Sequence, residues 1–435
     1  MKLTIDFDKA TGIVKPMNAV NNGPVIGKRG SNLEAYQAMK TPYARTHDAS
    51  FYAGYGGYHT VDVHVVFPDF DADPEDPASY DFQLTDEYME KIIRGGAKVF
   101  YRLGGKIEHE SMKYGTLVPP DFHKWAVICE HIIAHMNEGW ANGHAYGIEY
   151  WEIWNEPDLD KDDASNKRCW QGTAAEFYEL FAIAAKHLKA RFPHLKIGGP
   201  AAAGFRDWWM VPFFEKMRAE NVPMDFWSWH CYTADPMTLV NLAKKHREFL
   251  DSYGYTGTES ICNEWNYVKG WTNENGWNET QESIIGIKGA AFVMGAMSVC
   301  QNAPIDMLMY YDARPSIWNG LFDFYTKLPL KPYYSIKAWG ELAELENSCA
   351  AACDVPEIYA AAASGEGGKM AIVTYFTNNA DAVAKTFTVD AAQIGDAVSL
   401  YLLDEAHDMA KVAEIYPDEG KFQLTMQPNT VIVLK

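Results

Sequence analysis

The sequence has little positive charge. Its 435 residues include 38 Lys and Arg against 58 Asp and Glu, so the formal net charge at pH 7 is −20. A surface of this sign is repelled by phosphate groups, which argues against nucleic acid and anionic membrane surfaces as partners. The charge balance favours a soluble enzyme whose ligand is uncharged.

Cysteine pairs and long apolar runs are also missing. The seven Cys form no CxxC motif, which favours reduced thiols in a cytoplasm over a disulfide framework. The N-terminal MKLTIDFDKA carries Asp6 and Asp8 where a signal peptide needs an apolar stretch, so no export signal is expected. The most apolar helix candidate, at 289–299, is too short to span a bilayer. We therefore expect a cytoplasmic protein without a membrane partner.

Aromatic residues, by contrast, are abundant. They make up 14% of the chain, with 14 Trp and 25 Tyr, in a globular composition that is 48% hydrophobic and 22% charged. Trp and Tyr offer flat apolar faces with hydrogen-bonding edges, which suits sugar binding. A large aromatic core has the same composition, so this feature alone does not decide between the two.

Apolar strand-like runs alternate with amphipathic helices over residues 15–348. The helix expected from Asp121 to Asn137 has apolar residues at helical spacing, and Thr173 with Glu176 forms a capping box that starts another. Eight strand–helix units in this length predict an α/β fold, a (β/α)8 TIM barrel. The expected strands lie near 15–20, 41–47, 97–104, 148–156, 195–200, 225–232, 258–264 and 306–312.

The last part of the chain has a different pattern. Short alternating segments separated by turns occupy 349–435, as in 369–377 and 430–435, and they predict a C-terminal antiparallel β-sandwich domain. The opening segment also alternates, so we expect Met1–Phe7 to pair with this domain. The predicted domains are therefore 15–348 for the barrel, and 1–14 plus 349–435 for the sandwich.

Polar side chains follow the predicted barrel strands where each strand ends. In a parallel barrel the carboxyl ends of the strands meet at one rim, which carries the active site. Six strands contribute polar or titratable groups to that rim: Arg45 and His47; Glu108 and His109; Asn155 and Glu156; His230 and Tyr232; Asn263, Glu264, Trp265 and Asn266; and Tyr311 and Asp312, with Trp318 soon after.

Two of these residues, Glu156 and Glu264, suit glycoside hydrolysis. That reaction needs one carboxylic acid to protonate the leaving oxygen and one carboxylate to attack the anomeric carbon. Asn155 adds an amide for a sugar hydroxyl. Glu152 alternates inward with Glu156 along the same strand, and we interpret it as an ion-pair partner inside the barrel rather than as a catalyst.

The segments 154-WNEPDL-159 and 263-NEWN-266, at the ends of the fourth and seventh strands, carry a family resemblance. With 67–82, 102–109 and 320–339 they resemble glycoside hydrolase family 39, the β-xylosidase and α-L-iduronidase family of retaining clan A barrels. The resemblance implies that Glu156 is the acid/base and Glu264 the nucleophile. It further implies that Asn155 holds the 2-hydroxyl, Tyr232 and Arg45 orient Glu264, and His47, His109 and His230 line the subsite for the cleaved sugar. Trp265 and Trp318 complete the expected substrate-binding residues.

The expected function is therefore an exo-acting, β-xylosidase-like retaining hydrolase that acts on a glycoside or oligosaccharide without a cofactor. Galactose, glucose, arabinose and iduronate stay open as the sugar, because the long insert at 51–81 departs from xylosidase members. The same residues would also fit a non-catalytic carbohydrate-binding barrel or a metal-dependent hydrolase. The run Asp69–Asp76 alternates Asp like a calcium loop but lacks the required Gly and closing Glu, and no His/Cys set has zinc spacing. No metal is expected.

Overall fold

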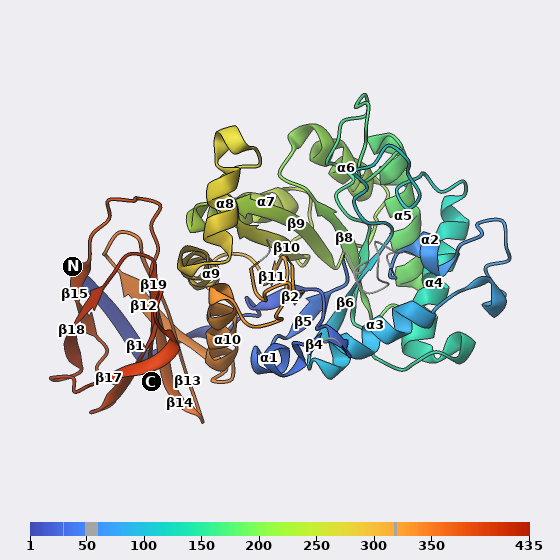
Figure 1. Ribbon diagram of the computed structural model, residues 1–435. Coiled ribbons are helices and arrows are strands. Elements are labelled where there is room, and N and C mark those ends of the chain that lie inside the picture. Colours follow the sequence, from blue (N-terminus) through green and yellow to red (C-terminus); the bar gives the residue numbers. More distant parts are fainter. Residues whose placement is uncertain (29, 48–59, 317–319) are drawn as a thin grey trace.

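The computed structural model describes residues 1–28, 30–47, 60–316 and 320–435. Its two parts are a closed barrel surrounded by helices and a separate sheet that contains both chain termini (Figure 1). Helices α9 (Ile287–Cys300) and α10 (Lys331–Ala343) lie between them.

The barrel has eight parallel strands and confirms the predicted fold class. Neighbouring strands around the closed barrel run in the order β10-β11-β2-β5-β6-β7-β8-β9. The first strand begins four residues later than expected, at Ala19. The strands are β2 (Ala19–Asn21), β5 (Tyr43–Arg45), β6 (Lys98–Leu103), β7 (Tyr150–Ile153), β8 (Lys196–Ala202), β9 (Phe226–Thr233), β10 (Glu259–Tyr267) and β11 (Met307–Tyr310).

The predicted helix signals are present at the helix ends. The capping box of Thr173 and Glu176 is formed, and the Asp121 carboxylate accepts from the first free N–H groups of its helix. The remaining helices are α1 (Leu33–Ala38), α2 (Val63–Val66), α3 (Gln83–Arg94), α4 (Phe122–Glu138), α5 (Ala174–Arg191), α6 (Asp207–Ala219), α7 (Pro236–Ser252) and α8 (Trp277–Ile284), with short 3-10 turns at Pro77–Ser79, Trp140–Asn142 and Asn273–Asn275.

No single helix in the described ranges is long and apolar enough to cross a membrane. Helices α8 and α9 meet the length and composition test only as a pair, across a bend of 82°.

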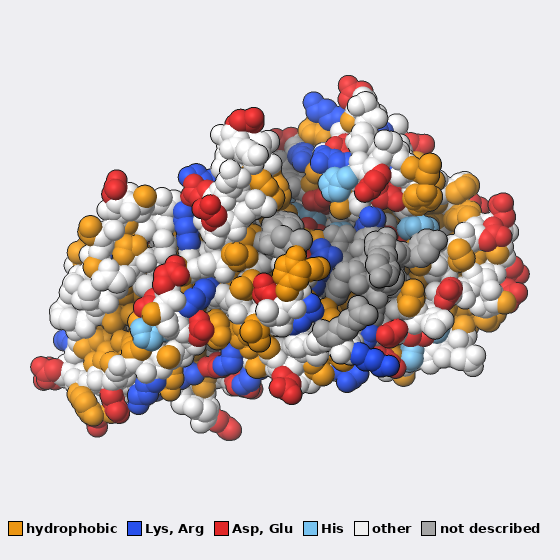
Figure 2. All heavy atoms as spheres, in the orientation of Figure 1, with side chains coloured by type: hydrophobic (Ala, Val, Ile, Leu, Met, Phe, Trp, Pro, Cys, Tyr) orange, Lys and Arg blue, Asp and Glu red, His pale blue; other side chains and the backbone are white. Residues whose placement is uncertain are grey.

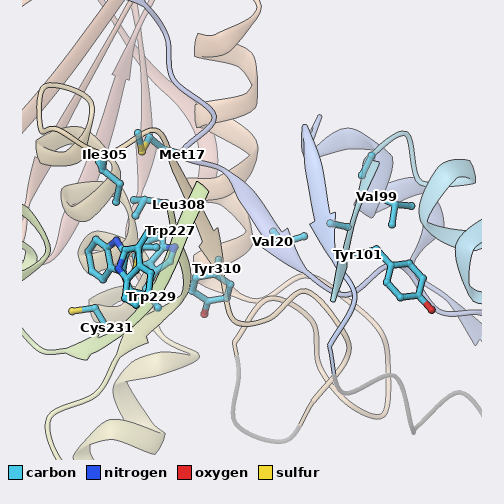
Figure 3. Packing of buried hydrophobic residues seen from close by; sticks show 14 of the residues in the cluster. Met17, Val20, Val99, Tyr101, Trp227, Trp229, Cys231, Ile305, Leu308 and Tyr310 are labelled. Atoms are coloured by element: carbon cyan, nitrogen blue, oxygen red, sulfur yellow. The ribbon is translucent and has the colours of Figure 1, made fainter. Parts of the chain in front are cut away.

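Strand alternation separates two kinds of core. On β9, Trp227, Trp229 and Cys231 face outward toward the helices (Figure 3), while Phe226 belongs to an apolar layer inside the barrel. That inner layer also contains Ala19, Phe100, Tyr150, Ile261, Met307 and Met309. Two residues further along β5 and β7, the interior becomes ionic with Arg45 and Glu152. The apolar layer thus closes one end of the barrel and supports the polar groups beyond it.

The second part is a nine-stranded sheet of order β17-β16-β19-β14-β13-β12-β1-β15-β18, antiparallel except where β1 meets β15. Leu3 pairs with Cys353 on β12, so the predicted pairing of the N-terminal segment is confirmed. The exact domain boundaries stay a prediction. The strands are β1 (Lys2–Ile13), β12 (Asn347–Cys353), β13 (Ile358–Gly365), β14 (Gly368–Tyr375), β15 (Lys385–Asp390), β16 (Val398–Leu403), β17 (Asp408–Ile415), β18 (Lys421–Met426) and β19 (Thr430–Leu434); β3 (Ile26–Gly27) and β4 (Gly30–Ser31) form a separate ribbon.

Candidate active site

The chain turns sharply after β7 and so directs Glu156 to the barrel rim. Trp154 and Glu156 have φ angles of 78° and 49°, in the left-handed region that costs non-glycine residues about 1–3 kcal/mol each. Packing and hydrogen bonds hold this conformation. The Trp154 indole donates to the Cys169 carbonyl at 2.7 Å, and the Glu156 N–H donates to the Ala201 carbonyl at 3.0 Å. The buried Trp154 therefore anchors the turn that presents the carboxylate.

A β-bulge on β10 positions Glu264. Cys262 pairs with Trp229 and Glu264 with His230, so Asn263 is the additional residue. Both Asn263 and Glu264 consequently reach into the barrel, where Asn263 donates to Glu152 and Glu264 accepts from Arg45. Strict alternation would have placed only one of the two inside.

Arg45 connects three other residues of the site through its guanidinium group. Its side chain is completely buried, and its Nε donates to Glu152 at 2.6 Å, Nη1 to Glu264 at 2.7 Å and Nη2 to Asn155 at 2.7 Å. Burial would lower the pKa of Arg45, but the charges of Glu152 and Glu264 outweigh burial and raise it. The guanidinium therefore fixes both glutamates and the Asn155 amide in one charged network.

Both oxygens of Glu264 accept hydrogen bonds. Oε1 accepts from Arg45, and Oε2 accepts from the Tyr232 hydroxyl at 2.8 Å. The Nε2 of His47 lies 3.6 Å from Oε1. Burial raises the pKa of Glu264 above its ordinary value, while His230, Arg45 and the Tyr232 hydroxyl oppose that rise. Both hydrogen bonds stabilise the ionised form of Glu264, because each of its carboxylate oxygens accepts from a donor.

Glu156 lies on the other side of His230. His230 Nδ1 is 2.7 Å from Glu156 Oε1 and 3.6 Å from Glu264 Oε2, and the nearest oxygens of the two glutamates lie within 4.8 Å of each other. Burial would lower the pKa of His230, but the charges of Glu264 and Glu156 raise it. At 2.7 Å a proton must lie between Glu156 and His230, whichever of the two holds it.

Two predicted residues are not brought to this centre. His109 is exposed on the loop after β6, where its backbone carbonyl accepts from the Asn166 amide at 3.2 Å. Trp265 is fully buried on the outer face of β10 against Phe292 and Tyr310, because the residue after an inward Glu264 points outward. The prediction that Trp265 binds substrate is not supported by this placement. Trp318 lies outside the described residues.

Two further residues belong to the site, although they were not predicted from the sequence. Asn21 accepts from Arg45 Nη1 at 3.1 Å at the end of β2, a strand end from which no site residue was predicted. Trp271 has an exposed fraction of 55% and lies edge-on to Tyr232 with ring centroids 5.2 Å apart. Its position soon after the seventh strand, in a Gly-Trp step, was the available signal.

The structure also describes Glu152, the predicted ion-pair partner, and the run Asp69–Asp76, whose Asp residues alternate as in a calcium loop. Glu152 is an ion-pair partner inside the barrel, as predicted, and the structure identifies its partner as Arg45. The carboxylates of Asp69, Asp73 and Asp76 each accept an N–H two residues ahead, which is local turn bonding. Glu156, His230 and Glu264 are close enough to bind a metal ion, but Arg45 already supplies a positive charge to Glu264.

Fold and site together define the class: a (β/α)8 barrel that presents two glutamates at the ends of β7 and β10. Residues 38–249 match the model for Glycosyl hydrolases family 39. A β-xylosidase of Geobacillus stearothermophilus is 29% identical over 185 residues, 39% of this chain and 34% of that protein. A β-xylosidase of Caldicellulosiruptor saccharolyticus is 26% identical over 247 residues, 54% of this chain and 47% of that protein. These matches support membership of glycosyl hydrolase family 39, as the motifs indicated, and they span about a third to a half of the length of these relatives.

Solved structures share the whole architecture. A glucosidase from Croceicoccus marinus superposes with a TM-score of 0.79 at 19% identity, over 100% of this chain and 98% of that chain. A GH39 enzyme from Xanthomonas axonopodis pv. citri gives 0.74 at 15% identity, over 100% and 96%. A monomeric β-xylosidase from Caulobacter crescentus CB15 gives 0.73 at 15% identity, over 100% and 98%. At these identities the likeness establishes the fold of both parts.

Proposed function

We propose that this chain is a retaining, exo-acting glycoside hydrolase that cleaves β-linked sugars by double displacement. The observation that carries the proposal is the pair Glu156 and Glu264, whose nearest oxygens lie within 4.8 Å. Retaining enzymes hold their carboxyl groups about 5–5.5 Å apart, whereas inverting enzymes need about 6.5–9.5 Å to admit a water molecule. The short separation supports direct attack by one carboxylate.

Glu264 is the proposed nucleophile. Arg45 and Tyr232 donate to its two oxygens, and its side chain is only 7% exposed. These donors stabilise the ionised form and aim the carboxylate. Glu264 attacks the anomeric carbon, and the bond between that carbon and the leaving oxygen breaks. Its carboxylate becomes an ester and loses its charge.

Glu156 is the proposed acid/base. Its Oε1 shares a proton with His230 Nδ1, and its side chain is more open than that of Glu264, at 14% exposure. In the first step this proton passes to the leaving oxygen. In the second step Glu156 takes a proton from water, whose oxygen attacks the anomeric carbon and displaces Glu264 as a carboxylate.

The proposed sugar is xylose, because the two curated relatives are named β-xylosidases. Asn155 accepts from Arg45 through Oδ1, which leaves its amide nitrogen as the donor toward a sugar hydroxyl. Arg206, a candidate for binding a uronate, instead pairs with Asp158 at 3.1 Å. This engagement favours a neutral sugar over iduronate.

The test is turnover of a panel of aryl glycosides, with the β-xyloside compared with the β-glucoside, β-galactoside, arabinoside and iduronide. Proton NMR of the first product should show the β-anomer. Glu264→Ala should lower kcat for every substrate by at least about four orders of magnitude. Glu156→Ala should affect poor leaving groups most, because an activated phenol departs without protonation.

Azide distinguishes the two roles. With an activated phenol, Glu156→Ala should accumulate the covalent intermediate and yield a β-glycosyl azide, whereas Glu264→Ala should yield the α-azide. Glu149→Gln is the matched control, since Glu149 pairs with Lys196 just before β7 and away from the rim. Swapped azide anomers would reverse the assignment. Unchanged turnover in both alanine variants would show that other residues carry out the reaction. No turnover of any glycoside by the native chain would leave a binding barrel as the better description.

A further inference from the structure

Asp86, His135 and His144 form a second cluster of ligating groups, outside the barrel. Asp86 lies in the first turn of α3, His135 in the last turn of α4, and His144 in the loop that leads toward β7. Asp86 Oδ1 is 3.0 Å from His135 Nε2, and Asp86 Oδ2 is 3.3 Å from His144 Nε2. One ligand atom from each residue lies within 4.8 Å of the other two. None of these groups contacts the glutamates of the rim.

Hydrogen bonding fixes the tautomer of His135. Its Nδ1 lies 2.9 Å from the Trp140 carbonyl, so Nδ1 carries a proton and donates it to that oxygen. A neutral His135 then points the lone pair of Nε2 at the Asp86 carboxylate, 3.0 Å away. Two acceptors at this distance repel each other unless a positive charge lies between them. The outward-turned Nε2, with Nδ1–H bound to a carbonyl, is the arrangement of a metal-ligating histidine.

His144 adds a second imidazole that faces the same carboxylate. Its Nε2 is buried and has no hydrogen-bond partner, although it faces the second oxygen of Asp86 at 3.3 Å. The two imidazole rings lie only 5.6 Å apart, so both Nε2 atoms and the carboxylate converge on one point. A divalent cation satisfies both nitrogens and the carboxylate while the imidazoles stay neutral.

The surroundings hold the three ligands in place. Phe82 stacks on His135 with ring centroids 3.5 Å apart, and Tyr146 stacks on His144 at 4.3 Å. The loop between them is tight, because a Cβ at Gly143 would come within 2.1 Å of the His135 carbonyl oxygen. That same carbonyl accepts the His144 N–H at 2.6 Å. The chain therefore folds back so that residue 144 meets residue 135.

We infer that Asp86, His135 and His144 bind a divalent transition-metal ion of the Zn²⁺ class. A tetrahedral zinc ion with bonds of about 2.0–2.1 Å holds its ligand atoms about 3.3 Å apart. Here His135 Nε2 lies 3.0 Å from Asp86 Oδ1 and His144 Nε2 lies 3.3 Å from Asp86 Oδ2, so small side-chain adjustments suffice to bring one oxygen and both nitrogens around an ion. The side chain of His135 is 2% exposed, whereas those of Asp86 and His144 are 27% and 25% exposed, so the cluster lies close enough to the surface for an ion to enter. The ion would join α3, α4 and the following loop. The sequence did not indicate this site, because its ligands are not grouped in a short motif. His135 lies 49 residues after Asp86, and His144 lies 9 residues after His135, on separate elements.

The test is zinc binding by the full-length chain after EDTA treatment, followed by isothermal titration calorimetry. The native chain should bind one equivalent, with a rise in Tm, because the ion binds only the folded state. Asp86→Asn and His144→Phe should each weaken binding at least tenfold and abolish the rise in Tm. His187→Asn is the matched control, since His187 pairs with Glu130 at 2.6 Å but belongs to neither group of three ligating residues in the described ranges.

Two further measurements keep the outcomes distinct. Cobalt(II) bound in place of zinc should give the visible bands of a tetrahedral nitrogen and oxygen site, and these bands should disappear in His144→Phe. Glu264→Gln should leave zinc binding unchanged, because Glu264 belongs to the other close group of titratable residues. Native-like zinc affinity in folded Asp86→Asn and His144→Phe, loss of binding in Glu264→Gln, or no uptake by the native chain would each overturn the inference.

Discussion

Arg45 shows how one buried cation allows two carboxylates to share a confined site. It donates to Glu152 and Glu264 on opposite sides, and Glu152 in turn accepts from Ser228 at 2.5 Å. Removing one partner of such a network leaves an uncompensated buried charge, which costs about 3–5 kcal/mol. The buried guanidinium of Arg45 therefore holds Glu264 in place more firmly than a flexible surface group would.

The hydroxyl of Tyr232 should control the acid limb of the pH profile. Its hydrogen bond stabilises ionised Glu264 and thus lowers a pKa that burial raises. In the native chain kcat/KM should therefore fall with acidification at a pH above about 4.3, the ordinary value for Glu. Tyr232→Phe removes a bond to a charged group worth about 1.5–3 kcal/mol, so the acid limb should move up by about 1–2 pH units.

Tyr150→Phe is the control for that experiment. Tyr150 donates to Glu259 at 2.9 Å in the lower part of the barrel, so the variant loses the same kind of bond away from the rim. Its acid limb should stay in place. An unmoved or lowered limb in Tyr232→Phe would show that Glu264 is not the group whose ionisation limits the rate.

Trp271 should bind the part of the substrate beyond the cleaved sugar. Its indole is 55% exposed and contacts Tyr232, which contacts Glu264. Aromatic stacking contributes about 0.5–1.5 kcal/mol, so Trp271→Ala should raise KM for xylobiose by up to about tenfold with little change in kcat. Trp208→Ala on α6, at 43% exposure, should change neither value. A fall in kcat alone would place Trp271 in the chemistry instead.

At the scale of elements, alternation explains which predictions succeeded. Glu152 and Arg45 could be placed inside the barrel because β5 and β7 are regular, and their ion pair is present. Trp265 was misplaced because ordinary alternation after an inward Glu264 turns it outward, whereas the bulge at Asn263 brings Asn263 into the interior beside Glu264. No local sequence signal marks such a bulge, since it depends on the pairing of β10 with β9 and β11. Strand ends were therefore predictable, whereas side-chain directions beside the bulge were not.

The turn after β7 buries a carboxylate whose ionisation should affect stability. Burial raises the pKa of Asp158 to about 6, although Arg206 and the Ala203 N–H oppose the rise. Because the folded pKa exceeds the unfolded value of about 3.9, the protonated carboxyl of Asp158 contributes to the free energy of unfolding. That contribution is fully present below about pH 3.9 and is lost as pH rises through about 6. Two pKa units correspond to about 3 kcal/mol.

Asp158→Asn should remove this pH dependence. The difference in unfolding free energy between the native chain and Asp158→Asn, from urea titrations, should shift by about 2 kcal/mol against the native chain from pH 4 to pH 7. Asp163→Asn, exposed in the same loop, should show no such shift. A constant difference for Asp158→Asn would mean that Asp158 ionises as easily in the folded chain as in the unfolded one.

At the scale of the whole molecule, the formal net charge is −20. Acidic and basic side chains are interspersed on the face shown in Figure 2. The charge excess therefore concerns solubility and the repulsion of polyanions, as expected from composition. Arg45, the main cation of the site, is buried and therefore does not contribute to the charge of the surface.

The barrel and the sheet should unfold together, because β14 is buried on both faces. Ile372 belongs to the large hydrophobic cluster of the barrel and its helices, whereas its neighbour Val373 packs in the separate core of the sheet. Helices α9 and α10 fill the space between the two parts (Figure 1). Neither part can separate without exposing apolar surface, so calorimetry should show one transition.

Two neighbouring substitutions test this coupling. Ile372→Ala should cost about 2–5 kcal/mol and Val373→Ala a smaller amount, since fewer buried methyl groups are removed. If the parts share one cooperative unit, both variants lower the same Tm, and both lower the thermal inactivation midpoint of the barrel's hydrolytic activity. Two separate transitions, with Val373→Ala moving only one and leaving inactivation unchanged, would show that the sheet is an independent domain. The sheet would then contribute nothing to the stability of the rim, although its β1 is the first strand of the chain and its β12 follows directly after the last barrel helix.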